Sequence, residues 1–184
     1  MLEDKIRWNK KFLSQPMPQE PARVVKEYIS HAKVGDALDI ACGTGRHTHF
    51  LAELGFLVDA VDFSDYALSK IKNMATINRI ESDLDRYNIP ANRYDLIINT
   101  NYLNRRLLPM IVDGLKSGGV VIFETFIVAH GDFENPQMNV DYLLRENELL
   151  RTFSGLHVIF YEERLDTNLR GERVKIASIV AQKR

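Results

Sequence analysis

Short apolar runs alternate with segments of helical periodicity over most of the chain, and this pattern predicts an α/β fold. The predicted strands span residues 37–41, 57–63, 75–81, 94–99, 120–125, 156–163 and 173–182. The predicted helices span residues 22–32, 46–54, 107–116 and 148–153, and a further helix begins after Ser64, a good N-cap residue. Mostly apolar strands that alternate with helices are typical of a parallel sheet with helices on both faces.

The last third of the chain follows a different pattern. Residues 126–147 form a long irregular stretch, and a short polar turn at residues 166–171 joins the last two strands. A connection this short makes an antiparallel hairpin, because a parallel crossover needs about a dozen residues or more. We therefore expect a three-layer α/β sandwich whose mostly parallel, seven-stranded sheet ends in an antiparallel C-terminal hairpin.

Composition indicates an ordinary globular protein and argues against a polyanionic partner. Hydrophobic residues make up 45% of the chain, charged residues 27%, and the net charge is −1. A nucleic-acid-binding domain usually carries a basic patch, so we expect a small-molecule substrate and no nucleic acid. We also expect no membrane contact and a cytoplasmic location, because the chain has no long apolar run and its N-terminus is charged throughout. The single cysteine, Cys42, excludes an intrachain disulfide.

The most informative stretch is LDIACGTG at residues 38–45, where a predicted strand runs into a glycine-rich turn and a helix follows. Glycine allows unusual backbone angles and close approach to a ligand, and a helix N-terminus attracts an anionic group. Dinucleotides and S-adenosylmethionine are the two ligand classes that use this layout. A tight strand-to-helix turn without a ligand is the third interpretation.

Two details of this stretch disfavour an NAD-dependent oxidoreductase. Gly43 and Gly45 supply the first two glycines of the dinucleotide fingerprint, but Thr48 occupies the place of the third. Asp39 lies inside the predicted strand, where a dinucleotide-binding fold normally has apolar residues. Both details favour S-adenosylmethionine as the ligand, while the oxidoreductase remains an alternative.

LDIACGTG resembles the first motif of class I S-adenosylmethionine-dependent methyltransferases, which combines an acid with a glycine-rich turn; Ala41 stands where many members have glycine. The resemblance covers about residues 32–125 and implies a Rossmann-like fold and S-adenosyl-L-methionine as cofactor. It implies that Asp62 accepts hydrogen bonds from the ribose hydroxyls and that Asp83 and Leu84 hold the adenine, although both acids also suit solvated positions. The cofactor-binding residues that it implies are Asp39, Ala41, Gly43, Gly45, Asp62, Phe63, Asp83, Leu84 and Asn99.

Polar residues follow the predicted strands at 94–99 and 120–125. Ligands of open α/β sheets bind at the carboxyl ends of the strands. Asn99 and Tyr102 are therefore the candidate catalytic residues of an acceptor pocket, and a polar strand end is the equal alternative for Asn99. Glu124, Thr125 and His130 are further candidates at the same edge.

A narrower resemblance rests on WNKKF at residues 8–12 and on Tyr102–Leu103 with Arg105–Arg106. These residues look similar to the tellurite-resistance-related branch of small-molecule methyltransferases. The resemblance implies in-line methyl transfer to a small molecule, which yields S-adenosylhomocysteine. An RNA or protein methyltransferase and a non-catalytic cofactor-binding protein remain alternatives, as do a monomer and a homodimer.

We expect one domain over residues 1–184. Residues 1–33 form an N-terminal lid or helix segment, residues 34–125 the cofactor-binding core, and residues 126–184 a substrate-side loop and the C-terminal hairpin.

Several other polar residues suit structural or solvated positions better than a site. His47 and His49 point in different directions from a helix, so we expect no metal site and an exposed or partly buried place for both. Surface exposure is slightly favoured over anion binding for Arg105–Arg106. Glu162 and Glu163 are expected to be exposed on a late strand.

Overall fold

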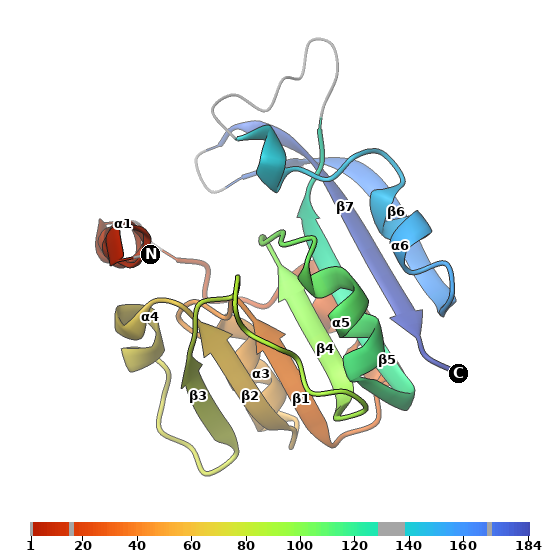
Figure 1. Ribbon diagram of the computed structural model, residues 1–184, viewed down its shortest axis with the longest axis horizontal. Helices are drawn as coiled ribbons and strands as arrows, with labels where there is room; N and C mark the ends of the chain where they lie inside the picture. Colours follow the sequence, from red (N-terminus) through yellow and green to blue (C-terminus); the bar gives the residue numbers. More distant parts are fainter. Residues whose placement is uncertain (1, 15–16, 129–138, 169–170) are drawn as a thin grey trace.

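The computed structural model describes residues 2–14, 17–128, 139–168 and 171–184 and confirms the expected architecture (Figure 1). These residues form a seven-stranded sheet in the order β3-β2-β1-β4-β5-β7-β6. Its strands are β1 (Asp36–Ile40), β2 (Leu57–Asp62), β3 (Ile77–Glu81), β4 (Tyr94–Thr100), β5 (Leu115–Phe126), β6 (His157–Thr167) and β7 (Arg173–Gln182). The first five strands pair in parallel, and β7 pairs antiparallel with both β5 and β6. The pairing of β6 with β7 is the hairpin that the short last turn predicted.

Helices cover both faces of the sheet. They are α1 (Leu2–Ser14), α2 (Arg23–Tyr28), α3 (Arg46–Glu53), α4 (Asp65–Ser69), α5 (Leu107–Gly114) and α6 (Glu148–Thr152), with 3₁₀ turns η1 (Ile29–His31) and η2 (Val140–Tyr142). Figure 1 shows α5 and α6 in front of the sheet, α3 behind it, and α1 set apart beside α4. The predicted N-cap Ser64 is confirmed, because its hydroxyl accepts a hydrogen bond from Ala67 N at the start of α4.

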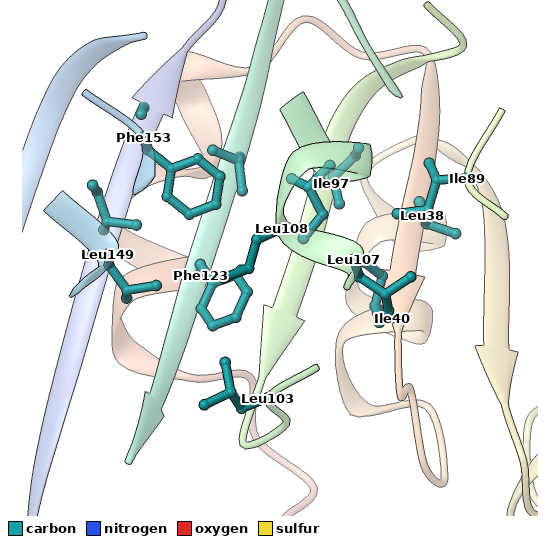
Figure 2. Close-up of a cluster of buried hydrophobic side chains, with 14 of the residues drawn as sticks. Leu38, Ile40, Ile89, Ile97, Leu103, Leu107, Leu108, Phe123, Leu149 and Phe153 are labelled. Carbon is teal, nitrogen blue, oxygen red and sulfur yellow. The ribbon is translucent and has the colours of Figure 1, made fainter. Parts of the chain in front are cut away.

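Side-chain alternation along each strand divides the core between the two faces. In β1, Leu38 and Ile40 pack on the side of α5 with Leu107 and Phe123 (Figure 2), whereas Ala37 packs on the side of α2 and α3. Asp39 lies between Leu38 and Ile40 and therefore faces α3. This alternation decides which polar side chains at the strand ends face a helix.

Two predicted helices end earlier than expected. The helix predicted at residues 22–32 continues after Tyr28 as the tighter turn η1, in which Ala32 N donates to Ile29 O. The helix predicted at residues 107–116 ends at Gly114, because Leu115 already pairs with Tyr94 in β5. Residues 117–119, which lie between the predicted helix and the predicted strand at 120–125, belong to β5, whose register with β4 shifts there.

Candidate functional site

A cavity of about 790 Å³ opens at the carboxyl ends of β1, β2, β4 and β5, next to the glycine-rich turn. It is lined by Trp8, Lys11, Phe12, Met17, Pro18, Ala22, Arg23, Ala41, Cys42, Gly43, Thr44, Arg46, His47, Asp62, Phe63, Leu84, Thr100, Asn101, Tyr102, Glu124, Phe126, Arg164, Asp166, Thr167, Asn168, Glu172, Val174 and Ile176. The volume is within the range typical of small-molecule sites. Among the predicted site residues Ala41, Gly43, Asp62, Phe63, Leu84 and Tyr102 line the cavity, and Asp39, Gly45, Asp83 and Asn99 do not.

The turn after β1 uses left-handed backbone angles at three of its five residues. The φ angles are +52° at Ala41, +55° at Gly43 and +85° at Gly45. Glycine adopts such angles without a Cβ penalty, whereas Ala41 carries a cost of roughly 1–2 kcal/mol there. A Cβ added to Gly43 would lie 3.2 Å from a ring carbon of Phe12. The turn is therefore narrow and is covered from above by the ring from α1.

Asp62 holds this turn from the end of the neighbouring strand β2. Its Oδ2 accepts a hydrogen bond from Gly43 N at 2.8 Å, and its Oδ1 accepts one from Ser64 N at 2.8 Å. Burial raises the pKa of the carboxyl above its ordinary value, and the backbone donors act against that rise. Each carboxylate oxygen has two lone pairs, so Asp62 retains acceptor capacity toward the cavity that it lines.

Asp39 is buried behind the turn, where it stabilises the first turns of α3. Its Oδ2 accepts a hydrogen bond from Thr48 Oγ1 at 2.6 Å, and the residue is 1% exposed. Burial raises the pKa of this carboxyl to about 7, although the bond from Thr48 lowers it. The two residues that disfavoured a dinucleotide, Asp39 in the strand and Thr48 in place of the third glycine, are therefore bonded to each other.

Asp83 and Leu84, the predicted adenine-binding pair, differ in their surroundings. Leu84 is buried and lines the cavity. Asp83 lies outside the cavity wall, and its Oδ1 accepts a hydrogen bond from Asp85 N at 3.0 Å. Of the pair, Leu84 therefore faces the cavity, and the Asp83 side chain does not.

The two candidate catalytic residues are joined at the end of β4. Asn99 Nδ2 donates to Tyr102 O at 2.7 Å, which holds the turn that follows the strand. Asn99 is buried, with 2% exposure, on the face that carries Ile97, whereas Tyr102 lines the cavity. Burial raises the pKa of the Tyr102 hydroxyl to about 12, so the hydroxyl is protonated at neutral pH.

His47 is fully buried, so the expectation of an exposed or partly buried histidine is wrong for this residue. It faces the segment before α2, and its Nε2 accepts a hydrogen bond from Ala22 N at 3.1 Å. Burial lowers the pKa of the ring to about 3. His49 is half-buried and points elsewhere, with its Nε2 accepting from Lys72 N at 2.9 Å. The described residues contain no cluster of His, Cys, Asp or Glu that could hold a metal ion.

The side chains at positions 105–106 and 162–163 form ion pairs and hydrogen bonds that the sequence did not indicate. Arg105 and Arg106 are exposed, as the sequence favoured, but Arg105 also forms an ion pair with Glu148 and Arg106 donates to the backbone oxygen of Leu84. Glu162 and Glu163 are half-buried, so the expectation that they are exposed is wrong; Glu162 pairs with Arg23 of α2, and Glu163 pairs with Lys175 of β7. Of the other candidates, Glu124 lines the cavity, Thr125 is buried outside its wall, and His130 lies outside the described residues.

Three cavity-lining arginines were not singled out from the sequence. Arg23 begins α2, Arg46 begins α3, and Arg164 lies on β6. Arg164 bonds Glu124, which also accepts from Ser178 Oγ at 2.6 Å. The position of Arg46 directly after Gly45 was the only local signal, because the other two arginines approach the cavity from distant parts of the chain.

The fold and the glycine-rich turn define a Rossmann-like domain of the class I S-adenosylmethionine-dependent methyltransferase type. The crystal structure of an S-adenosylmethionine-dependent methyltransferase from Mesorhizobium loti matches this fold with a TM-score of 0.68 and 18% sequence identity. The match covers 90% of this chain and 100% of that chain. The crystal structure of TehB from Haemophilus influenzae matches with a TM-score of 0.75 and 22% identity, over 96% of this chain and 66% of that chain. At such identities the likeness concerns the fold.

The sequence profile described as "TehB: Tellurite resistance protein TehB" matches residues 5–180, and the chain belongs to this family. It is 28% identical over 172 residues to the Haemophilus influenzae protein named "Probable S-adenosyl-L-methionine-dependent methyltransferase TehB". The alignment covers 85% of this chain and 59% of that protein, so the chain spans about three fifths of the length of this relative. No helix in the described ranges is long and apolar enough to cross a lipid bilayer.

Proposed function

We propose that this chain is an S-adenosyl-L-methionine-dependent methyltransferase that transfers a methyl group to a small-molecule acceptor. The observation that carries the proposal is the hydrogen bond from Gly43 N to the Asp62 carboxylate. This bond fixes the narrow glycine turn at the wall of a cavity of about 790 Å³. The TehB relative from Haemophilus influenzae supports the choice of cofactor through its name.

The residues around the turn fit an amino-acid-tailed nucleoside. Asp62 has lone pairs left for two ribose hydroxyls, and Leu84 offers an apolar contact for a base. Gly43 lets the backbone approach a ligand without a side chain in the way. Two further residues of the predicted cofactor set act behind the turn at the start of α3: Asp39 accepts a hydrogen bond from Thr48, and Gly45 is the N-cap residue of the helix.

The cofactor supplies a methyl group on a sulfonium, which is already a good leaving group. The protein therefore has to align the acceptor and exclude water. Trp8 and Phe12 of α1 cover the cavity and exclude water, and Tyr102 presents a protonated hydroxyl that can orient an acceptor. Asn99 positions Tyr102 through the backbone bond at 2.7 Å.

Calorimetric titration with S-adenosylhomocysteine, followed by an assay of its release over a panel of small acceptors, tests the proposal. We expect binding and turnover. NADH binding without S-adenosylhomocysteine binding would indicate an oxidoreductase, and binding without turnover on any acceptor would indicate a non-catalytic protein. RNA binding that weakens steeply with salt would indicate an RNA methyltransferase; the net charge of −1 argues against it.

A further inference from the structure

Glu124 near the end of β5 presents a carboxylate oxygen to the cavity. The residue is 8% exposed and lines the cavity wall. Its Oε2 accepts hydrogen bonds from Ser178 Oγ at 2.6 Å and from Arg164 Nη2 at 3.2 Å, whereas no described residue donates to its Oε1. Protein does not enclose this oxygen either, because Thr76 Oγ1 is the one side-chain atom of the described residues that is both enclosed and unbonded. Oε1 can therefore accept a hydrogen bond from a bound molecule.

The strand register places this carboxylate next to an apolar part of the wall. Glu124 is opposite Ser178 in the pairing of β5 with β7, and Phe126 is opposite Ile176 two residues further along. Residues two apart in a strand share a face with the residues directly opposite them. Phe126 and Ile176 also line the cavity. A molecule that donates to Glu124 would therefore pack its body against apolar side chains.

Carboxylates outnumber cations in the ion-pair network that includes Glu124. Among the described residues this network joins four carboxylates to two guanidiniums, those of Glu27, Glu124, Glu162, Asp166, Arg23 and Arg164. Arg46 of α3 is a further cation near Glu124, so that four carboxylates still face three cations. An excess of one sign of charge at a cleft favours a ligand of the opposite sign.

The order of the strands places Glu124 on the acceptor side of the proposed cofactor site. Gly43, Asp62 and Leu84 lie at or after the ends of β1, β2 and β3, which are consecutive at one side of β4. Glu124 is on the other side of β4, in register with Thr100 at the end of that strand. A methyl acceptor that enters beside the cofactor would therefore meet this carboxylate.

We propose that Glu124 binds the amino group of the methyl acceptor and accepts its proton, so that the substrate is a primary or secondary amine with a small apolar body. This inference rests on the proposed function, because S-adenosylmethionine supplies the methyl group. An ammonium brings both a positive charge and several N–H donors to a carboxylate, and the resulting hydrogen bond is charge-assisted. A hydroxyl brings one donor and no charge.

The transfer balances in protons and electrons. The bound ammonium gives one proton to Glu124 Oε1, and the electron pair of that N–H bond stays on nitrogen. This pair forms the bond to the methyl carbon while the carbon–sulfur bond breaks and leaves its electron pair on sulfur. The products are the methylated ammonium and S-adenosylhomocysteine, and Glu124 passes its proton to water. A positioned base of this kind contributes roughly 100-fold to 10,000-fold to the rate.

Amines and alcohols of matched shape test the inference. Calorimetry on the intact chain, saturated with S-adenosylhomocysteine, compares benzylamine, cyclohexylmethylamine and hexylamine with benzyl alcohol, cyclohexylmethanol and hexanol. We expect an amine to bind more tightly than its alcohol by roughly 10-fold to 100-fold, the usual range for a buried charge-assisted hydrogen bond. Glu124→Gln should abolish this preference, and Glu124→Asp should retain part of it. With S-adenosylmethionine, mass spectrometry should detect the N-methylated amine, and Glu124→Gln should slow its formation by about 100-fold or more.

Glu27→Gln is the matched control, because it removes a carboxylate of the same ion-pair network from an exposed position outside the cavity wall. We expect it to keep the preference for the amine within about 3-fold of the wild type. Unchanged affinity for S-adenosylhomocysteine shows that each variant is folded.

The inference is overturned if the wild type binds none of the amines more tightly than its alcohol. It is also overturned if Glu124→Gln keeps the preference. In either case, binding of S-adenosylhomocysteine by the wild type leaves the proposed function standing. If the wild type does not bind S-adenosylhomocysteine, the proposed function itself fails.

Discussion

His47 accepts a hydrogen bond from the backbone N–H of Ala22 at 3.1 Å, which joins the helix behind the glycine turn to the segment that leads into α2. Both residues line the cavity. The bond therefore ties the wall formed by Met17, Pro18 and Ala22 to the part of the chain that is proposed to hold the cofactor. We expect this contact to affect both stability and cofactor affinity.

The first prediction concerns replacement of His47. His47→Leu should lower the free energy of unfolding by roughly 1–3 kcal/mol, because it leaves the Ala22 N–H without its acceptor. His47→Gln retains an acceptor oxygen and should lose less. Urea denaturation measures both variants, and calorimetry with S-adenosylhomocysteine shows whether the wall affects binding. Equal losses in the two variants would show that ring packing, and not the hydrogen bond, explains the stability.

The second prediction concerns the pH dependence that Asp39 causes. Its pKa is about 7 in the folded protein, above the ordinary value of 3.8, so the folded state binds the proton more tightly than the unfolded chain. The contribution of Asp39 to stability therefore falls as pH rises through this window. Asp39→Asn keeps an acceptor for Thr48 and removes the titration. Its stability relative to the wild type should rise by roughly 2–4 kcal/mol between about pH 4 and about pH 8.

The pH profile of the wild type alone would hide this effect. The pKa of His47 is lowered to about 3 from its ordinary 6.5, so its contribution to stability rises with pH over that window, opposite in sign to that of Asp39. The two contributions partly cancel in the range where their windows overlap. Urea denaturation at several pH values must therefore compare Asp39→Asn with the wild type, and a difference that is constant with pH would contradict the prediction.

The third prediction compares two glycines with similar backbone angles. Gly45 has φ +85° and Gly118 has φ +80°. A Cβ on Gly45 would lie 2.8 Å from Ile71 Cγ1, whereas a Cβ on Gly118 meets nothing within 4 Å. Gly118→Ala should cost about 1–2 kcal/mol for the backbone alone, and Gly45→Ala should cost roughly 1–3 kcal/mol more because of the overlap. Equal thermal stabilities of the two variants would contradict the crowding of the turn.

The fourth prediction concerns Asp62. Both of its oxygens accept backbone N–H groups, so Asp62→Asn would direct an amide NH₂ at one of these donors. We expect it to weaken S-adenosylhomocysteine binding by at least about 10-fold and to lower stability by roughly 1–3 kcal/mol. Asp65→Asn, directly after Ser64 at the exposed start of α4, is the control and should leave affinity within about 3-fold of the wild type. Unchanged affinity of Asp62→Asn would contradict the role assigned to this carboxylate.

The fifth prediction uses Trp8, the only tryptophan of the chain. Because Trp8 lines the cavity, saturation with S-adenosylhomocysteine should change its fluorescence emission. The emission titration should yield the dissociation constant that calorimetry measures. An unchanged spectrum at a concentration that calorimetry shows to be saturating would place the ligand away from α1.

Much of the fold was predictable because its signals are local. The apolar runs of β1 and β4, the N-cap Ser64 and the short turn before β7 each depend on neighbouring residues. The end of α5 was not predictable, because Gly114 is followed by Leu115, whose pairing with Tyr94 is a contact between strands. Local propensity contains no information about such a contact.

The sequence by itself determined the order of strands and helices, the glycine-rich turn at residues 41–45 and the acid at the end of β2, since periodicity and turn chemistry act over a few residues. Tertiary structure alone decided which polar side chains face the cavity. It turned Asp39 toward Thr48, buried His47 under Ala22, and brought Arg164 from the C-terminal hairpin to Glu124. These outcomes depend on burial and on contacts between distant segments, which arise only when the sheet is assembled.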